Sequence, residues 1–346
     1  MPLTDELKRW LDAHPELRSS PGKRQRKVGH DYRSRCIYLV TLCVDGRDRM
    51  LGELSAPDEY HRIPHVVLSA LGKVVLKVWN DIPSHYPAVR VLKLQVMPDH
   101  VHGILFFTEP VPYHLGQVIN GFKKGCNDAV KASSDGRFRK LWEDSYDDTI
   151  LTDKWQLKHM TDYLADNPRR LWVRNHNGEL FTKMRVTVAG SDAMMMGNAH
   201  LLSYEKKLYV QCTNRLSGEE LEQRKRNFIA KCEEGYVPVT AGISKVEKAV
   251  KNWALENGHE MILVTDDGMG ELWKPTGRLF DACGNGKLLI VAMGQPHRYS
   301  RTIKREVCLM LNEKALAITE GRFSHSQGGA LRDSSHSQGI ALREVD

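Results

Sequence analysis

The chain has 346 residues, more than the roughly 250 to 300 at which single hydrophobic cores stop growing, so we expect two domains. Hydrophobic residues make up 41% and charged residues 27% of the chain, which excludes a mostly disordered protein. No apolar stretch approaches the roughly 18 residues of a membrane-spanning helix, and residues 1–9 lack the order of a secretory signal. We therefore expect a cytoplasmic protein with no membrane partner.

Basic residues are concentrated near the N-terminus. Between residues 18 and 35, seven Lys or Arg side chains stand against the single acid Asp31, and the whole chain has a formal net charge of +7. This density suits contacts with the phosphates of a nucleic acid, and we expect residues 1–29 to form a basic arm in which Arg24, Arg26 and Lys27 bind DNA. A solvated arm without a binding role fits the pattern equally well.

The next segment, residues 30–178, follows the order strand, helix, strand, strand, helix. Apolar and β-branched runs predict strands over residues 36–43, 89–96 and 103–107, and helical spacing of apolar residues predicts helices over residues 64–81 and 113–131. Met97-Pro98-Asp99 predicts the turn of a β-hairpin. This order is typical of an α+β domain of the ferredoxin-like, split βαβ type with an antiparallel sheet.

From about residue 179 short apolar runs alternate with helical segments. Strands are expected over residues 208–212, 236–240, 261–265 and 288–293, and helices over residues 219–232 and 245–257. We therefore expect a smaller Rossmann-like α/β domain over residues 179–322. Its turn at residues 240–244 precedes a helix and could hold phosphate, but without a GxGxxG motif a structural role is favoured. Two near-copies of an 11-residue Ser- and Gly-rich sequence then predict a disordered tail over residues 323–346.

Two histidines mark the candidate chemistry. His100 and His102 follow the hairpin turn two residues apart, so in a strand both imidazoles project from the same face and can reach one metal ion. The alternative is a pair of polar residues on the solvated side of a hairpin.

A second candidate element is a helix expected over residues 153–166. Asp153 and Gln156 resemble a capping box at its start, and Pro168 should end it. His159, Tyr163 and Asn167 are spaced four apart on one side of this helix, near its apolar stripe. Taken alone, this spacing is more typical of a surface histidine, a packing tyrosine and a capping asparagine.

In combination, these motifs resemble the single-tyrosine HUH transposases, and within them the transposases associated with repetitive extragenic palindromes. The resemblance covers residues 30–175 and rests on the strand before Asp45, on MPDHVHG at 97–103, on LWE at 141–143 with YD at 146–147, and on DYLADNP at 162–168. It implies that His100, His102 and Asn167 hold a divalent ion, Mg or Mn, and that Tyr163 is the nucleophile. Tyr146 is the competing nucleophile, but acidic neighbours on both sides disfavour it.

The resemblance implies a metal-dependent transposase or nickase that cleaves and rejoins single-stranded or hairpin DNA, at palindromic repeats, through a 5′-phosphotyrosine. Further phosphate contacts are expected from Lys123, Lys124, Arg137, Arg139 and Lys140. The alternative function is a non-catalytic binder of palindromic hairpins. A homodimer with shared sites and a monomer are both compatible with the sequence, and residues 179–322 have a distant similarity to the Rossmann-like domain of DNA-processing protein A.

Overall fold

The computed structural model describes residues 26–27, 29–133, 140–270, 273–294, 304–327 and 330–333. The chain divides into two compact units, Met1–Trp172 and Val173–Asp346, which are described separately. The division falls slightly before the expected boundary at residue 178. Within the described ranges, each helix is too short or too polar to cross a membrane.

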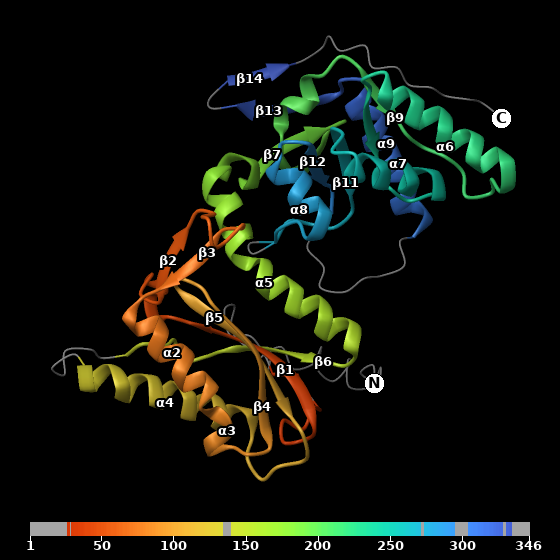
Figure 1. The fold of residues 1–346 in the computed structure, drawn as a ribbon. Coiled ribbons are helices and arrows are strands. Elements are labelled where there is room, and N and C mark those ends of the chain that lie inside the picture. The colour runs from red at the N-terminus through yellow and green to blue at the C-terminus, as the bar shows by residue number, and fades with distance from the viewer. Residues whose placement is uncertain are drawn as a thin grey trace. The chain divides into compact units, whose positions relative to one another are not determined.

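The first unit is built on a four-stranded antiparallel sheet (Figure 1). Its strands are β1 (Cys36–Cys43), β4 (Val89–Val96), β5 (His100–Phe107) and β6 (Asp147–Leu151), in the order β4-β5-β1-β6. The predicted α+β class with an antiparallel sheet is confirmed. Strand β5 begins at His100, three residues earlier than expected, and this places both histidines of the pair inside the strand.

Helices cover both faces of this sheet. Helices α2 (Ala70–Asn80), α3 (Ile82–His85) and α4 (Leu115–Ser133) lie on one face, and α5 (Lys154–His176) lies on the other (Figure 1). Between the sheet and the first group is the main core, where the rings of Trp79 and Phe122 meet edge to face with centroids 5.1 Å apart. A smaller cluster under α5 joins Leu164 to Ile104 of β5 and Leu39 of β1.

The helix expected over residues 64–81 is wrong at its start. Residues His65–Leu68 form β3, which pairs with β2 (Gly52–Ser55) in a separate two-stranded sheet. The helix begins only at Ala70, because the Ser69 hydroxyl caps it by accepting a hydrogen bond from the Gly72 amide at 3.0 Å. Val66 and Val67 fit a strand and a helix equally well by spacing, and the pairing with β2 decides between the two.

The prediction that Pro168 ends its helix is also wrong. Helix α5 runs through Pro168 to His176, and Leu164, Asn167, Pro168 and Arg170 are buried along it. An interior proline removes one backbone hydrogen bond and costs about 3 kcal/mol. Burial of side chains around the proline, among them Leu164 against the sheet, is a contribution of similar size, so the helix continues past the proline.

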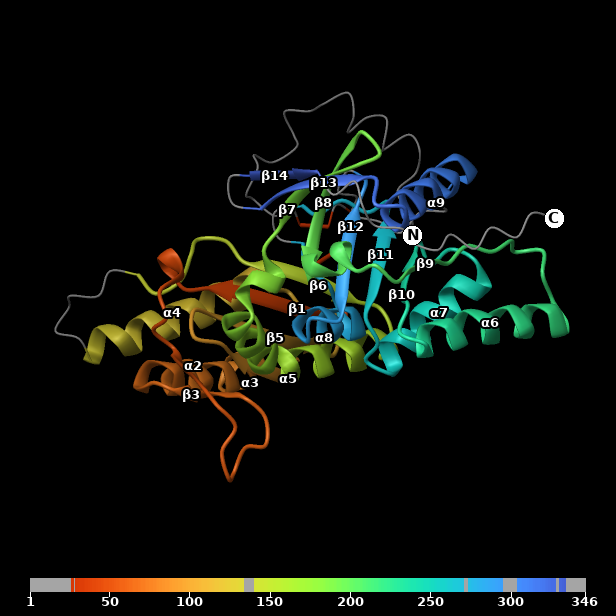
Figure 2. The ribbon, with the colours of Figure 1, turned by 90° about the horizontal axis from the view of Figure 1, so that it is seen from above.

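The second unit contains an eight-stranded sheet in the order β14-β13-β7-β8-β12-β11-β10-β9 (Figure 2). The strands are β7 (Met184–Val188), β8 (Ser191–Gly197), β9 (Lys207–Tyr209), β10 (Val237–Thr240), β11 (Met261–Thr265), β12 (Leu288–Ala292), β13 (Phe323–Gln327) and β14 (Ala330–Asp333). Strands β9 to β12 are parallel, as the alternation of strands and helices predicts. The antiparallel half of the sheet was not expected.

Helices pack on both faces of the parallel strands. Helix α9 (Arg305–Thr319) contributes Leu311, Ala315 and Ile318 to the core on one face, and α6 (Gly218–Glu233), α7 (Lys245–Glu256) and α8 (Gly277–Gly284) lie on the other. Short 3-10 helices occupy Asp45–Arg47, Gly178–Phe181 and Ala199–Ser203.

The tail predicted as disordered is ordered over its first part. Phe323 is only 8% exposed and belongs to the core of the second unit, and β13 pairs with β7 and β14. The open backbone edge of β7 accepts a strand whatever its side chains, so composition alone misjudged this segment. Residues 334–346 of the predicted tail lie outside the described residues.

Candidate active site

His100 and His102 lie at the start of β5, and the structure brings their imidazoles together. The two Nε2 atoms are 3.1 Å apart, and the rings meet edge to face with centroids 4.7 Å apart. His102 is two residues from Ile104, which packs under α5, so the pair projects from the face of the sheet that α5 covers. Two imidazole nitrogens at this separation can bind a single ion, because metal–nitrogen distances are about 2.0–2.1 Å.

The other nitrogen of each ring is held by a neighbouring side chain. Nδ1 of His102 lies 2.8 Å from the Thr41 hydroxyl on β1, and Nδ1 of His100 lies 2.6 Å from Oδ1 of Asp99. Since a carboxylate accepts, Nδ1 of His100 donates this hydrogen bond, and Nε2 is the nitrogen of His100 that can bind a metal ion. Such outer partners orient metal-binding histidines in general, so the geometry fits a metal site.

Asp99 is in turn paired with Arg47, whose Nε is 3.3 Å away. Burial alone would raise the pKa of Asp99, but the hydrogen bond from His100, with the charges of His100 and Arg47, outweighs burial and lowers it. Arg47 and Thr41 were not predicted from the sequence as orienting residues. For Thr41 a signal existed, because it is the single polar residue in the apolar run of β1.

Helix α5 positions the other two expected site residues. Leu164 anchors the helix on the sheet beside Ile104, two residues from His102. Tyr163, next to this anchor, is 37% exposed, and the Arg170 guanidinium lies over its ring, 5.3 Å from the centroid. The structure thus places Tyr163 and the histidine pair on two elements that pack together, α5 and β5. The direct contact between site side chains is the one between His100 and His102.

Asn167 follows one turn after the anchor and is 7% exposed. Within the described residues its Nδ2 atom is buried without a hydrogen-bond partner. A buried amide without a partner is unfavourable by about 1–3 kcal/mol, and the oxygen and nitrogen of a carboxamide can exchange places by a flip. A flip would place the oxygen at this position, and a carboxamide oxygen is a suitable third donor for a divalent ion.

Tyr146, the competing nucleophile, belongs to the core. Only 8% of it is exposed, and the Arg26 guanidinium stacks on its ring at 3.5 Å from the centroid. Burial raises the pKa of Tyr146 to about 12, although the charge of Arg26 acts in the opposite direction. Inaccessibility, more than the acidic neighbours, makes this phenol a poor nucleophile.

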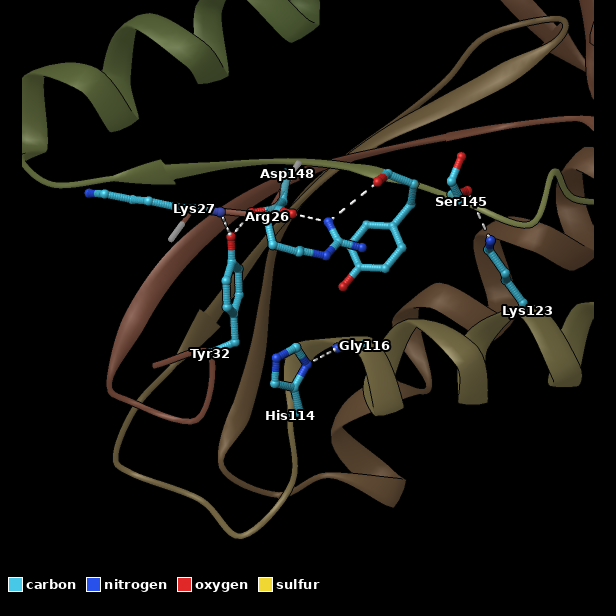
Figure 3. A network of polar contacts seen from close by, with 9 residues as sticks. Arg26, Lys27, Tyr32, His114, Gly116, Lys123, Ser145 and Asp148 are labelled. Carbon is cyan, nitrogen blue, oxygen red and sulfur yellow. Dashed lines mark hydrogen bonds and ion pairs between the residues drawn. The ribbon is translucent and has the colours of Figure 1, made fainter. Parts of the chain in front are cut away.

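Two of the expected DNA contacts have structural partners instead. The Lys123 ammonium donates to the carbonyl oxygens of Glu143, Asp144 and Ser145 at 2.6, 3.0 and 3.1 Å, which uses all three of its protons. Arg26 forms an ion pair with Asp148 (Figure 3). These contacts argue against the phosphate-binding role expected for Lys123 and Arg26.

Three of the remaining basic residues are described by the structure and three are not. Lys124 is a better candidate for a phosphate contact, because its side chain is 81% exposed and its ion pair with Asp128 is at the surface. Lys27 is a second candidate, because its side chain points away from the network around Tyr32 (Figure 3). Lys140 is bound to Asp144 at 2.9 Å and to Asp45 at 3.5 Å. The other expected contacts lie outside the described residues: Arg24, Arg137 and Arg139.

In the second unit, the turn at residues 240–244 does not offer a free phosphate site. The Glu247 side chain folds back over the start of α7, and its carboxylate accepts hydrogen bonds from the Ile243 amide at 2.8 Å and the Ser244 hydroxyl at 2.7 Å. Glu247 is 1% exposed. An internal carboxylate thus occupies the position in which an anion would bind, in agreement with the favoured structural role.

Comparisons with known proteins give partial likenesses. No family model matches the chain. An uncharacterized protein of Haemophilus influenzae is 25% identical over 174 residues, which cover 44% of this chain and 91% of that protein. Among solved structures, a REP-associated tyrosine transposase bound to a REP hairpin is 14% identical with a TM-score of 0.32, over 42% of this chain and 73% of that chain. DNA processing protein A of Streptococcus pneumoniae is 17% identical with a TM-score of 0.29, over 45% of this chain and 59% of that chain. TM-scores this low do not assign a function to this chain.

Proposed function

We propose that this chain is a metal-dependent DNA strand transferase of the single-tyrosine HUH type, related to the transposases associated with repetitive extragenic palindromes. In this proposal the first unit is a split βαβ domain that carries the chemistry, and the second is a Rossmann-like domain that contributes to DNA binding. The observation that carries the proposal is the histidine pair, with both Nε2 atoms 3.1 Å apart and both Nδ1 atoms held by other side chains.

His100 and His102, with the carboxamide of Asn167, would hold the ion, and Mg or Mn suits a phosphodiester substrate. Bound there, the ion would neutralise the non-bridging oxygens of the phosphate and stabilise the leaving oxygen. Histidine ligands would also accept Zn or Ni. Thr41 and Asp99 hold the two Nδ1 atoms, so Nε2 of each ring is the nitrogen that would bind the ion.

Tyr163 would be the nucleophile, because it is exposed on the helix that packs against the histidine strand. Its Oη attacks the phosphorus, the bond to the 3′ oxygen breaks, and that oxygen leaves with a proton as a 3′-hydroxyl. The DNA then remains joined to the protein as a 5′-phosphotyrosine. Attack by the 3′-hydroxyl of another strand restores a phosphodiester and frees the tyrosine, so the bond energy is conserved and no nucleotide cofactor is needed.

The test is an adduct assay with the full chain. Single-stranded DNA that carries a palindromic hairpin is incubated with the protein and Mn²⁺ or Mg²⁺, and protein–DNA adducts are separated on a denaturing gel. We expect an adduct with the wild type and with Tyr146→Phe, and none with Tyr163→Phe, His100→Ala or His102→Ala. Native gels on the same samples measure binding, which the histidine substitutions should change by only a few-fold.

The alternative, a non-catalytic hairpin binder, differs from the proposal in its prediction for the adduct assay. It predicts salt-sensitive binding of the hairpin by the wild type without any adduct. An adduct that survives in Tyr163→Phe and disappears in Tyr146→Phe would overturn the assignment of the nucleophile while leaving the reaction class in place.

A further inference from the structure

A second group of metal-ligating side chains lies far along the chain from the histidine pair, in the segment that joins β2 to β3. Figure 2 shows this segment as an orange loop that extends away from its strands. It carries Asp58 and His61, and His65 is the first residue of β3. One ligand atom from each of the three lies within 4.8 Å of those of the other two.

The Asp58 carboxylate is held in place by the backbone. Its Oδ1 accepts hydrogen bonds from the amides of Tyr60 at 2.9 Å and His61 at 2.6 Å, and the Asp58 amide donates to the His61 carbonyl at 2.8 Å. These three bonds close a turn that directs the carboxylate toward the imidazoles. The oxygen ligand is therefore already positioned before any ion binds.

Each of the two imidazoles has one nitrogen close to an oxygen of this carboxylate. Nδ1 of His61 is 3.1 Å from Oδ1 of Asp58, and Nε2 of His65 is 3.7 Å from Oδ2. The rings are stacked with centroids 3.8 Å apart and planes 19° apart. Within the described residues, Nδ1 of His65 is buried without a hydrogen-bond partner, so Nε2 is the nitrogen of His65 that a ligand can reach.

We propose that Asp58, His61 and His65 form a second divalent-metal site, which takes a Zn²⁺-class transition metal. Two imidazole nitrogens and one carboxylate oxygen are a ligand set that suits Zn²⁺ better than Mg²⁺. Three protein ligands leave a fourth position for water. At metal–nitrogen distances of about 2.0–2.1 Å the rings must tilt out of their stack, and the bound ion then fastens the loop to the first residue of β3. The proposal is independent of the chemistry at His100 and His102.

The test counts ions in a chain that lacks the first site. The full chain with His100→Ala and His102→Ala is freed of metal and titrated with Zn²⁺ in competition with a chromophoric chelator. We expect one ion per chain in this background, bound at least about tenfold more weakly after Asp58→Asn, His61→Gln or His65→Gln, because even outer-shell substitutions weaken metal binding about 10- to 100-fold. The matched control is His85→Gln, which removes an exposed histidine 3.5 Å from one carboxylate, Asp81, and should leave zinc binding unchanged.

A second readout reports on the loop itself. Arg62 lies in the loop and is exposed, so trypsin should cleave after it. In the chain with His100→Ala and His102→Ala, saturating Zn²⁺ should slow that cleavage, and it should not do so when His61→Gln is added. Zinc binding that is unchanged by substitution of Asp58, His61 and His65, or cleavage after Arg62 that is indifferent to Zn²⁺, would overturn the proposal.

Discussion

Lys123 and Lys124 are adjacent in α4, yet the structure gives them opposite roles, and replacing each by methionine separates the two. Lys123→Met keeps the apolar stem and removes the three hydrogen bonds to the carbonyls of residues 143–145. Water can replace the two exposed bonds, to Asp144 and Ser145, so the main loss is the half-buried bond to Glu143. A hydrogen bond that involves a charged group contributes about 1.5–3 kcal/mol. In a unit of this size, each kcal/mol of lost stability lowers the Tm by about 2–4 °C. Lys123→Met should therefore lower the Tm by roughly 3–12 °C.

Lys124→Met is the matched control. Its ion pair with Asp128, 3.2 Å long and at the surface, contributes about 0–1 kcal/mol, so the Tm should hardly change. If Lys124 contacts phosphate, its removal should weaken binding of single-stranded hairpin DNA and reduce the salt slope by about 0.7. Calorimetry gives the Tm, and fluorescence anisotropy at several salt concentrations gives the slope. A Lys123→Met chain with an unchanged Tm and a reduced salt slope would refute the structural role of Lys123.

Three further changes test the packing. Gly103→Ala would put a Cβ 2.1 Å from Cζ2 of the buried Trp79, so the free energy of unfolding measured with denaturant should fall by about 1–3 kcal/mol or more. An unchanged free energy of unfolding would contradict this packing beside the histidine pair. Burial lowers the pKa of Lys207 to about 8, below its value in the unfolded chain. As the pH rises from about 8 to 10, the free energy of unfolding of the wild type should therefore increase by up to about 3 kcal/mol relative to that of Lys207→Met. Curves of unfolding free energy against pH that stay parallel for the two chains would exclude the shift. A chain that ends at Arg322 loses the buried Phe323 and should be about 1.5–3 kcal/mol less stable than one that ends at Asp333, and equal stability would show that β13 contributes nothing.

Elements with a single strong local signal could be predicted from the sequence. β1 at Cys36–Cys43 and β11 at Met261–Thr265 have the expected bounds, because short apolar runs that are rich in β-branched residues and end at polar turns favour a buried strand over a helix. The helix expected at residue 64 failed where the spacing fits two structures and a distant partner, β2, decides. Pro168 shows the same limit, since a local preference of a few kcal/mol yields to burial that the local sequence does not reveal.

For the candidate site, sequence spacing identified His100 and His102 and placed them on one strand face, and the structure confirms their proximity. Their supports could not be predicted, because Thr41 meets His102 only through the register of two strands distant in sequence. Charge density alone also misled for Lys123, whose partners are backbone carbonyls about 20 residues later. Exposure and pairing are properties of the fold, and a run of basic residues does not contain them.

In the proposed reaction Tyr163 forms the covalent bond to DNA, and peptide mapping of the adduct identifies the residue that carries this bond. The wild-type chain is allowed to react with hairpin-bearing single-stranded DNA and Mn²⁺, the DNA is digested to a short remnant, and the protein is cut with trypsin. Tyr163 and Tyr146 then fall in different peptides, residues 159–169 and residues 141–154. The proposal predicts that mass spectrometry finds the nucleotide remnant on residues 159–169, on the tyrosine. A remnant on residues 141–154, or no remnant on any tyrosine of a chain that binds the hairpin, would contradict it.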